Sequence, residues 1–281
     1  MPPLRSILFT PGDSGRKLKK AAASNADAVV IDLEDAVAPS AVEKAHQLTV
    51  EALQTIDFGR TGRLVRVNAH TQEALVADLQ AIELGKPDGV VVPKVESADM
   101  LAFVEENLPD SIAIFALIET AAGFMHLSEI VKNSKRLEGL ILGGEDLIAS
   151  IGAKATASRN ELAYARGALV MAAAAYRLQA IDTVYTAWRD VEGLTKDAQE
   201  AAEIGFTGKL AIHPAQLPAI HKAFSPTAEE VAWANDVLLE SQRLKEQGIG
   251  VFSFGGRMID EAHVKLAERI MAVSKIGEED A

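Results

Sequence analysis

Short apolar runs alternate with helix-like segments along most of the chain, and this alternation limits the fold more than any other feature. Eight runs are rich in Val, Ile and Leu and have the length of buried strands. Strands that alternate with helices pair in parallel, with the helices packed outside. Eight such repeats favour an α/β fold of the TIM (β/α)8 barrel type over an open doubly wound sheet. The predicted strands are Ser6–Thr10, Ala28–Leu33, Leu64–Val67, Gly89–Val92, Ile112–Ile118, Leu137–Leu142, Ile181–Tyr185 and Gly208–Ile212.

The chain continues beyond the eighth predicted strand. Ser225-Pro226 marks a boundary, so the predicted domains are a barrel over residues 1–225 and a C-terminal helical extension over residues 226–281. The pattern leaves three roles open for this extension: a lid, an arm that packs on a neighbouring subunit, or helices packed on their own barrel. Helices are predicted from the capping box Thr227–Glu230 through Lys245 and over Ile259–Lys275, with the Gly-rich segment Gln247–Gly256 between them.

Composition and missing motifs exclude several classes of protein. A net charge of −12 disfavours general nucleic-acid binding, and the absence of cysteine excludes disulfides and thiolate metal sites. No apolar stretch has the length of a membrane span, and the first residues do not resemble a signal peptide, so we expect a cytoplasmic protein. The chain lacks G-x-G-x-x-G, Walker A, G-x-S-x-G and H-E-x-x-H motifs, which argues against dehydrogenases, P-loop enzymes, serine hydrolases and zincins.

Two carboxylates follow buried strands that are neighbours in the predicted barrel. Glu119 comes directly after Ile112–Ile118, and Asp146 follows Leu137–Leu142 across a Gly-Gly-Glu turn. Ligands and metals are held at the carboxyl ends of barrel strands. Each acid alone is a normal helix N-cap, but two on neighbouring strand ends can share one divalent cation. Because the ligands on offer are oxygens, the sequence favours Mg²⁺, or alternatively Mn²⁺, over zinc.

Other strand ends carry charges that suit an anionic ligand. Arg66 is flanked by valines, so it must be paired when buried, either with a neighbouring strand acid or with a substrate carboxylate, which we favour. Asp32 and Glu34 share one side of their strand end, where they bind metal, support other ligands or cap the next helix. Lys94 is a Schiff-base lysine, a carboxylate partner or a structural cation, and the nearby acids argue against the first role.

A run of cations follows the first strand in an otherwise acidic chain. A phosphate-bearing ligand explains cations at the start of a helix, and a solvated helix face is the alternative. His213, after the eighth strand, is either a general base or a structural hydrogen-bonding residue. The four cations are Arg16, Lys17, Lys19 and Lys20.

A series of motifs, in order along nearly the whole chain, resembles the citrate lyase β-subunit-like branch of the HpcH/HpaI aldolase superfamily. The motifs include RSILFTPGD from Arg5, ADAVVIDLEDAV from Ala26, VRVN from Val65, PKVE from Pro93, LIE from Leu117, GGEDL from Gly143, GFTGK from Gly205, IHP from Ile212 and GRMID from Gly256. The resemblance implies a TIM barrel that forms a homotrimer, and a Mg²⁺-dependent enzyme that cleaves or forms a C–C bond in a 3-hydroxy-acyl thioester of coenzyme A.

The resemblance also implies roles for individual residues. Glu119 and Asp146 would hold the metal, and Arg66 would bind the carboxylate of the oxo-acid. Arg16 and Lys20 would meet the phosphates of coenzyme A. An acid supplied by a neighbouring subunit corresponds to Asp260, two residues before an alanine where the family often has proline.

The expected reaction is therefore that of a malyl-, citramalyl- or citryl-CoA lyase, with glyoxylate, pyruvate or oxaloacetate as the oxo-acid. One alternative is a thioesterase or malate-synthase-like enzyme, in which water finally hydrolyses the thioester. Another is a subunit of a citrate lyase complex that acts on a thioester carried by an acyl carrier protein.

Overall fold

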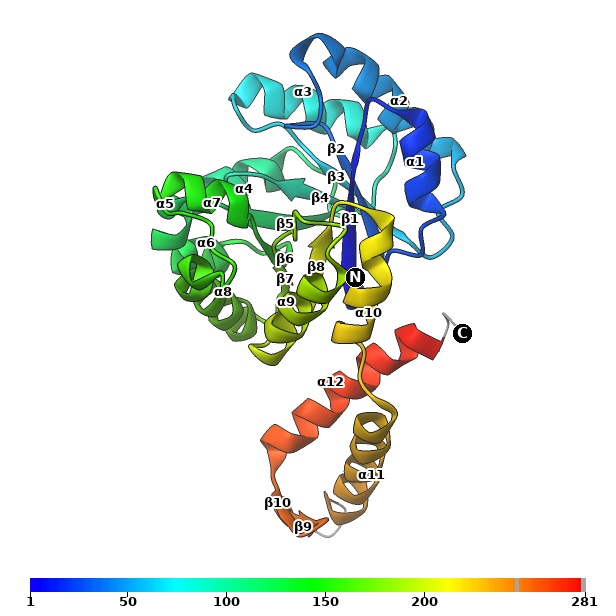
Figure 1. The fold of residues 1–281 in the computed structure, drawn as a ribbon, viewed down its shortest axis with the longest axis vertical. Coiled ribbons are helices and arrows are strands. Elements are labelled where there is room, and N and C mark those ends of the chain that lie inside the picture. Colours follow the sequence, from blue (N-terminus) through cyan, green and yellow to red (C-terminus); the bar gives the residue numbers. More distant parts are fainter. Residues whose placement is uncertain (246–247, 279–281) are drawn as a thin grey trace. The chain divides into compact units, whose positions relative to one another are not determined.

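Eight parallel strands close into a barrel in chain order, with β8 paired to β1 (Figure 1). The structure, a computed structural model, describes residues 1–245 and 248–278. The strands form the wall of the barrel and are four to six residues long. They are β1 (Ser6–Pro11), β2 (Ala28–Asp32), β3 (Gly62–Arg66), β4 (Gly89–Val92), β5 (Ala113–Ile118), β6 (Leu137–Leu142), β7 (Gln179–Asp182) and β8 (Gly208–Ala211).

Helices connect the strands and form the outer layer of the barrel (Figure 1). The predicted TIM barrel is therefore confirmed, and the predicted bounds of β4 and β6 are those of the structure. The helices of this part are α1 (Gly15–Ala22), α2 (Val42–Thr55), α3 (Gln72–Glu83), α4 (Ala98–Glu106), α5 (Ala121–Met125), α6 (Leu127–Asn133), α7 (Gly144–Ser150), α8 (Ala163–Tyr176), α9 (Val191–Glu203) and α10 (Leu217–Phe224).

The interior of the barrel is filled by branched side chains from most of its strands, including Ile7, Val30, Leu64, Val91 and Ile141. Full burial of one such side chain contributes about 1.5–3 kcal/mol. Phe115 is the largest fully buried side chain, and it fits because β6 carries a glycine opposite it. A Cβ at Gly139 would lie 2.8 Å from two ring carbons of Phe115, so the glycine provides the volume that the ring occupies.

A second buried cluster is made of charges. Lys209 on β8 forms ion pairs with Asp182 at the end of β7 and with Asp197 on α9, the latter at 2.7 Å. Arg166 on α8 binds Asp182 through Nε and Nη2, at 3.0 and 2.8 Å, and reaches Asp197 at 2.7 Å. Arg159 adds a bond of 3.3 Å to Asp197. We call these five residues the flank cluster; each buried charge in it has an opposite charge in contact, as burial requires.

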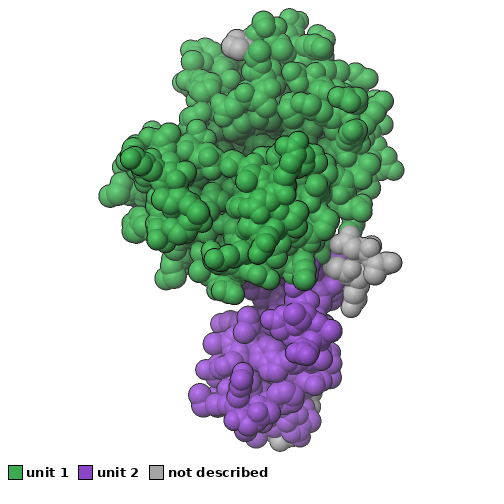
Figure 2. All heavy atoms as spheres, viewed as in Figure 1, with its two compact units in different colours: residues 1–223 green, residues 224–281 purple. Residues whose placement is uncertain are grey.

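The chain divides into two compact units, residues 1–223 and residues 224–281, coloured separately in Figure 2. The second unit contains α11 (Ala228–Lys245), β9 (Phe252–Phe254), β10 (Arg257–Ile259) and α12 (Glu261–Glu278). The predicted capping box is present, since Thr227 Oγ1 accepts from the Glu230 amide at 3.2 Å while the Thr227 amide donates to Glu230 Oε2 at 2.7 Å. Apolar side chains of both helices and both strands pack into one core, which includes Val237, Ile259 and Val264.

The start of the last helix was predicted wrongly. Ile259 ends a strand, and α12 begins at Glu261, because β9 and β10 form an antiparallel hairpin before it. Phe254 pairs with Arg257, so the connecting turn consists of Gly255 and Gly256, with φ angles of +56° and +76°. Two successive positive φ angles are typical of the type I′ hairpin turn, which glycine adopts without steric cost. Among the described residues, the helices include none that is long and apolar enough to cross a membrane.

Candidate active site

A cavity of about 460 Å³ opens at the carboxyl ends of the barrel strands. Its apolar wall includes Phe9, Leu117, Val184 and Leu210, which come from β1, β5, the segment after β7 and β8. Acids dominate its charged lining. Within residues 1–245 and 248–278, the charged residues of the lining are Asp32, Asp35, Arg66, Glu119, Glu145 and Asp146.

Glu119 follows β5 directly and points into this cavity with only 2% of its surface exposed. Its Oε1 accepts a hydrogen bond of 2.9 Å from the backbone amide of Lys94. Its Oε2 lies against Gly143, where a Cβ would collide with both Cβ and Oε2 of the glutamate. The turn after β6 is held by two further bonds, from Gly143 N to Ile118 O at 3.1 Å and from Gly144 N to Thr183 Oγ1 at 2.9 Å. The glycine at 143 therefore makes room for the carboxylate.

The electrostatic environment of Glu119 opposes its ionisation. Burial, and then the negative charge of Asp146, raise the pKa of Glu119 from 4.5 to about 8. Asp146 lies on the exposed rim, in the first turn of α7. In the part of the chain that the structure describes, no cation forms an ion pair with Asp146. The two acids thus face one cavity with more negative charge than the surrounding residues balance.

This arrangement fits a divalent cation. A buried carboxyl group with a raised pKa and a neighbouring unpaired carboxylate both gain from a positive charge placed between them. Carboxylate oxygens are the ligands that Mg²⁺ prefers, and Mg²⁺ is commonly held by one or two carboxylates with the remaining positions left to water or substrate. Glu119 and Asp146, predicted from sequence as a metal-binding pair, line the same cavity, and their role as ligands stays a prediction.

Arg66 ends β3 and is buried at the mouth of the barrel, the end where the cavity opens. Its guanidinium group already contacts acids there. Its Nε and Nη2 bind the two carboxylate oxygens of Asp32 at 2.8 and 2.7 Å, a bidentate pair. Its Nη1 faces Asp35 at 3.2 Å and Glu34 at 2.9 Å, and its guanidinium carbon lies 5.2 Å from the centroid of the Phe9 ring. The ion pair left open by the sequence is thus present. Arg66 nevertheless lines the cavity, so an anionic ligand would have to share or displace the contacts of Nη1 with Asp35 and Glu34.

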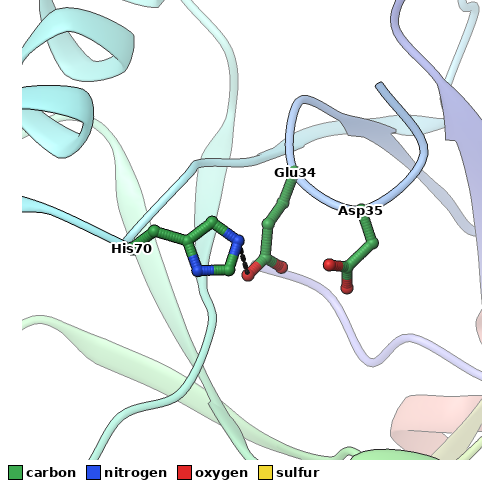
Figure 3. A group of neighbouring side chains, drawn as sticks. All are labelled: Glu34, Asp35 and His70. Atoms are coloured by element: carbon green, nitrogen blue, oxygen red, sulfur yellow. Dashed lines mark ion pairs between the residues drawn. The ribbon is translucent and has the colours of Figure 1, made fainter. Parts of the chain in front are cut away.

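Glu34, Asp35 and His70 form a group whose ligand atoms lie within 4.8 Å of one another (Figure 3). Such a group has the spacing of a metal site, but its buried member is already neutralised. Lys94 Nζ binds Glu34 Oε1 at 2.6 Å, whereas His70 Nε2 lies 3.7 Å from the same oxygen. Burial raises the pKa of Glu34, and Lys94 and Arg66 oppose that shift. Lys94 and Arg66 therefore already balance the charge of Glu34, which favours Glu119 and Asp146 as the metal site.

The basic residues after β1 are exposed on α1. Arg16 and Lys17 lie in its first turn, which begins a few residues after the cavity-lining Pro11. The first helical turn contains no acid, and within the described residues none of its cations forms an ion pair. Lys20 lies in the last turn of this short helix. These residues are available to an anionic ligand, as the sequence suggested, and their contact with coenzyme A stays a prediction.

Two other predicted residues have local structural roles. Asp260 belongs to the second unit, where its carboxylate accepts from the amides of Ala262 and His263 at 3.0 and 3.3 Å and so caps α12. Its relation to the cavity stays a prediction. His213 accepts from the Ala215 amide at 3.1 Å and stacks on Trp188, with ring centroids 4.1 Å apart, which supports its structural interpretation.

Sequence reasoning missed two features of the site. The amide of Lys94 binds Glu119 from a residue with a φ angle of +51°, a left-handed conformation that few residues other than glycine adopt and that no pattern indicated. The flank cluster was also missed, although Asp182 and Lys209 sit on neighbouring strands and would have signalled a buried ion pair.

The fold and the cavity together define a class: a TIM-barrel protein with an acid pair at the strand ends, suited to a divalent cation, next to an arginine. The family model described as HpcH/HpaI aldolase/citrate lyase matches residues 5–214. The chain belongs to this family, and within it to the citrate lyase β-subunit-like branch.

Similar proteins are known over nearly the full chain. A (3S)-malyl-CoA thioesterase of Cereibacter sphaeroides is 36% identical over 270 residues, which covers 96% of this chain and 94% of the relative. The mitochondrial citramalyl-CoA lyase of Homo sapiens is 32% identical over 291 residues, covering 97% and 86%. A crystal structure of the protein CitE from Mycobacterium tuberculosis, in complex with magnesium, acetoacetate and coenzyme A, has a TM-score of 0.78 and 35% identity, and covers 96% of this chain and 98% of that one.

Proposed function

We propose that this chain is a Mg²⁺-dependent carbon–carbon lyase that converts a 3-hydroxy-acyl-CoA thioester, such as malyl-, citramalyl- or citryl-CoA, into an acyl-CoA and an oxo-acid. The observation that carries the proposal is the acid pair. Glu119 is buried with a raised pKa, and Asp146 shares its cavity without an ion-pair partner among the described residues. The family of the chain and its lyase and thioesterase relatives support the same chemistry.

The residues of the cavity divide the work of such a reaction. Glu119 and Asp146 hold the cation, which when bound neutralises charge that develops on the hydroxyl oxygen as it becomes the oxo group. Arg66 meets the oxo-acid carboxylate on the side that lines the cavity, where the substrate competes with Asp35 for Nη1, while Asp32 fixes Nε and Nη2. The apolar wall around Phe9 and Leu117 excludes water, which strengthens these electrostatic interactions.

In the cleavage direction, the proposed reaction moves one proton from the hydroxyl group, breaks one C–C bond and returns one proton to carbon. The hydroxyl group of the substrate loses its proton, the adjacent C–C bond breaks, and its electron pair remains on the thioester fragment as an enolate. Protonation of the enolate carbon gives the acyl-CoA, and the other fragment leaves as the oxo-acid. Asp260, which resemblance to the family assigns to a neighbouring subunit, exchanges the proton at that carbon.

Product analysis tests this proposal and separates its rivals. Malyl-, citramalyl- and citryl-CoA are each incubated with the purified chain, in Mg²⁺ and then in EDTA. An acyl-CoA and an oxo-acid that appear only with Mg²⁺ support the lyase. Free CoA with an intact hydroxy-acid indicates a thioesterase instead, which is the activity for which the 36% identical relative is named. No turnover of any CoA thioester, with activity on an acyl-carrier-protein thioester, indicates a subunit of a larger complex.

The proposal includes a homotrimer in which residues 1–225 form the catalytic domain and residues 226–281 pack on a neighbouring subunit. Asp260→Asn tests the shared site better than alanine, because asparagine keeps the helix cap and removes only the negative charge. Asp260→Asn and Arg66→Lys should each lower turnover. A mixture of the two should recover part of it, since some sites would combine intact residues from different chains; no recovery would count against sharing.

The basic positions after β1 are proposed to bind the phosphates of the CoA thioester. Replacing Arg16 and Lys20 together by alanine should raise KM for the thioester several-fold and leave kcat nearly unchanged, because these exposed cations are placed away from the reacting bond. Lys132, an exposed cation in the last turn of α6, provides a matched control. An unchanged KM in the double variant would remove this part of the proposal. Cell fractionation would test the predicted cytoplasmic location.

A further inference from the structure

Lys94 contacts two acids at the mouth of the barrel, Glu119 through its backbone amide and Glu34 through its side-chain ammonium group. It follows β4 after Pro93, and the Val95 amide returns to the barrel by bonding Leu117 O at 3.3 Å. Between these points, Lys94 has a φ angle of +51°, and its amide donates to Glu119 Oε1 at 2.9 Å. At the same time, its side chain extends to Glu34, where Nζ lies 2.6 Å from Oε1. One residue thus contacts two buried carboxylates, which follow the ends of β2 and β5.

The backbone contact selects which oxygen of Glu119 stays available. Oε1 is occupied by the amide, and Oε2 lies beside Gly143, the residue that leads into α7 and Asp146. The Val95 amide is held by its bond to Leu117 O, so an extended or right-handed conformation at position 94 would either break that bond or displace the Lys94 amide and release Oε1. The carboxylate would then be free to rotate about its last bond.

The side-chain contact has a different consequence. Glu34 has no exposed side-chain surface, and among the described residues its Oε2 accepts no hydrogen bond, although Arg66 Nη1 lies 2.9 Å from it. The charge of Glu34 therefore depends on the ion pairs with Lys94 and Arg66. Without the ammonium group, Glu34, Asp35 and His70 would present three ligand atoms within 4.8 Å and one cation fewer. A divalent cation would then have a second place to bind.

We propose that Lys94 is a positioning residue for the metal site: its left-handed backbone fixes the carboxylate of Glu119, and its ammonium group keeps the cation out of the group formed by Glu34, Asp35 and His70. This inference rests on the proposed function, because it takes Glu119 and Asp146 as the metal ligands. It assigns the lysine no contact with the reacting atoms.

Mn²⁺ binding without substrate, followed by electron paramagnetic resonance and calorimetry, tests both parts. Lys94→Gly and Lys94→Val both remove the ammonium group, but only glycine adopts the left-handed conformation without strain. We expect Lys94→Val to bind Mn²⁺ at least roughly tenfold more weakly than Lys94→Gly, since a β-branched residue resists a positive φ angle. Lys86 supplies the matched control, because it is an exposed lysine with a φ angle of +50° in the turn between α3 and β4.

The control separates strain from positioning. Lys86→Gly and Lys86→Val should differ in stability as the Lys94 pair does, but bind Mn²⁺ equally well. Equal Mn²⁺ affinity in Lys94→Gly and Lys94→Val would overturn the backbone role. If Lys94→Val does not fold, Lys94→Ala replaces it, with a smaller loss expected in the same direction and the same meaning for an unchanged affinity.

Stoichiometry tests the role of the ammonium group. The wild-type chain should bind one Mn²⁺, and Lys94→Gly should bind a second that disappears when His70→Ala is added. A single ion in Lys94→Gly would overturn this role, and Lys94→Arg, which keeps the charge, should also retain one ion. Failure of the proposed function looks different: wild-type protein would then bind no Mn²⁺, or Glu119→Gln would bind it as well as wild type.

Discussion

The mouth of the barrel and the flank cluster are both groups of charges that are largely buried, and they differ in how completely those charges are matched. In the flank cluster, Asp182 and Asp197 are in contact with Lys209 and Arg166, and Arg159 adds a further cation. At the mouth, the two cations Arg66 and Lys94 are outnumbered by acids, some of which have no ion-pair partner in the described part of the chain. Among the described residues, these acids are Asp32, Glu34, Asp35, Glu119 and Asp146.

The titration of one acid in each place shows what this difference means. Burial alone would raise the pKa of Asp197, but Lys209 and Arg166 lower it to about 2. Glu119 has only a weak opposing influence from Arg66 and a backbone amide, so burial and Asp146 raise its pKa to about 8. A matched cluster stabilises the fold. An unmatched one costs stability, and that cost is recovered when a cation binds.

Glu119→Gln should produce the largest separation between the two regions. The amide keeps the shape of the side chain but removes a metal ligand, so we expect kcat/KM to fall about ten-thousandfold, equivalent to about 5.5 kcal/mol. Circular dichroism should show the fold intact. Mg²⁺-dependent turnover within tenfold of wild type would contradict the assignment of Glu119 as a ligand.

The pH dependence of stability should have opposite signs in the two regions. Because the folded-state pKa of Glu119 exceeds its unfolded value, the metal-free native state holds that proton more tightly, and stability falls as pH rises from about 4.5 to about 8. We expect wild type to lose about 3–5 kcal/mol relative to Glu119→Gln over this window, measured by urea unfolding in EDTA. Asp197 acts at the other end, since its lowered pKa gives stability that is lost as pH falls from 3.8 to about 2.

Saturating Mg²⁺ provides the control for this experiment. The cation binds the ionised form of Glu119, so it should remove most of the loss at high pH in wild type and change the Glu119→Gln variant little. If the two proteins lose the same stability between pH 5.5 and 8.5 in EDTA, the raised pKa does not belong to Glu119.

Asp182→Asn in the flank cluster should lower the free energy of unfolding, whereas the matching substitution at the mouth should not. The change leaves Lys209 and Arg166 with one acid fewer in a fully buried place, which should reduce the free energy of unfolding by about 3 kcal/mol. Urea unfolding at pH 8.5 measures this loss. Glu119→Gln, the matched amide substitution at the mouth, should be neutral or stabilising under the same conditions, and the reverse order would contradict the comparison.

Glu145→Gln should have the smallest effect, although it is next to a proposed ligand. Glu145 is half-exposed and lies 3.6 Å from Arg159, so its ion pair is worth less than about 0.5 kcal/mol. We expect its Mg²⁺ affinity to stay within about twofold of wild type, whereas Asp146→Asn should bind Mg²⁺ far more weakly. Similar losses in both variants, measured by calorimetry, would show that general negative charge rather than a specific ligand holds the cation.

Much of the fold was predictable because the barrel strands are read from an apolar pattern that burial imposes on both faces. The bounds of β4 and β6 follow from it directly, whereas the prediction for β2 ran one residue too far, since Leu33 is buried beyond the last paired residue. The β9–β10 hairpin was missed because its strands have three residues each and are partly exposed. The Gly255-Gly256 pair was the available signal.

The site was predictable in its acids and not in its connections. Strand ends place Glu119, Asp146 and Arg66 around one cavity, since the topology of a parallel barrel brings these ends together. The pairing of Arg66 with Asp32 depends on side-chain rotamers, and the contact of Lys94 with Glu119 depends on a positive φ angle. The sequence left open an ion pair of Arg66 with a neighbouring strand acid, but neither the geometry of that pair nor the positive φ angle follows from the order of residue types.

Gly143 has a consequence for how this chain can vary. Any other residue at that position would push against Glu119. An apolar substitution there, which itself offers no ligand atom, would therefore shift a proposed metal ligand by steric contact alone. An alanine there would report on catalysis while adding neither charge nor polarity. The position of Glu119 thus depends on a residue whose missing side chain leaves the volume that the carboxylate occupies.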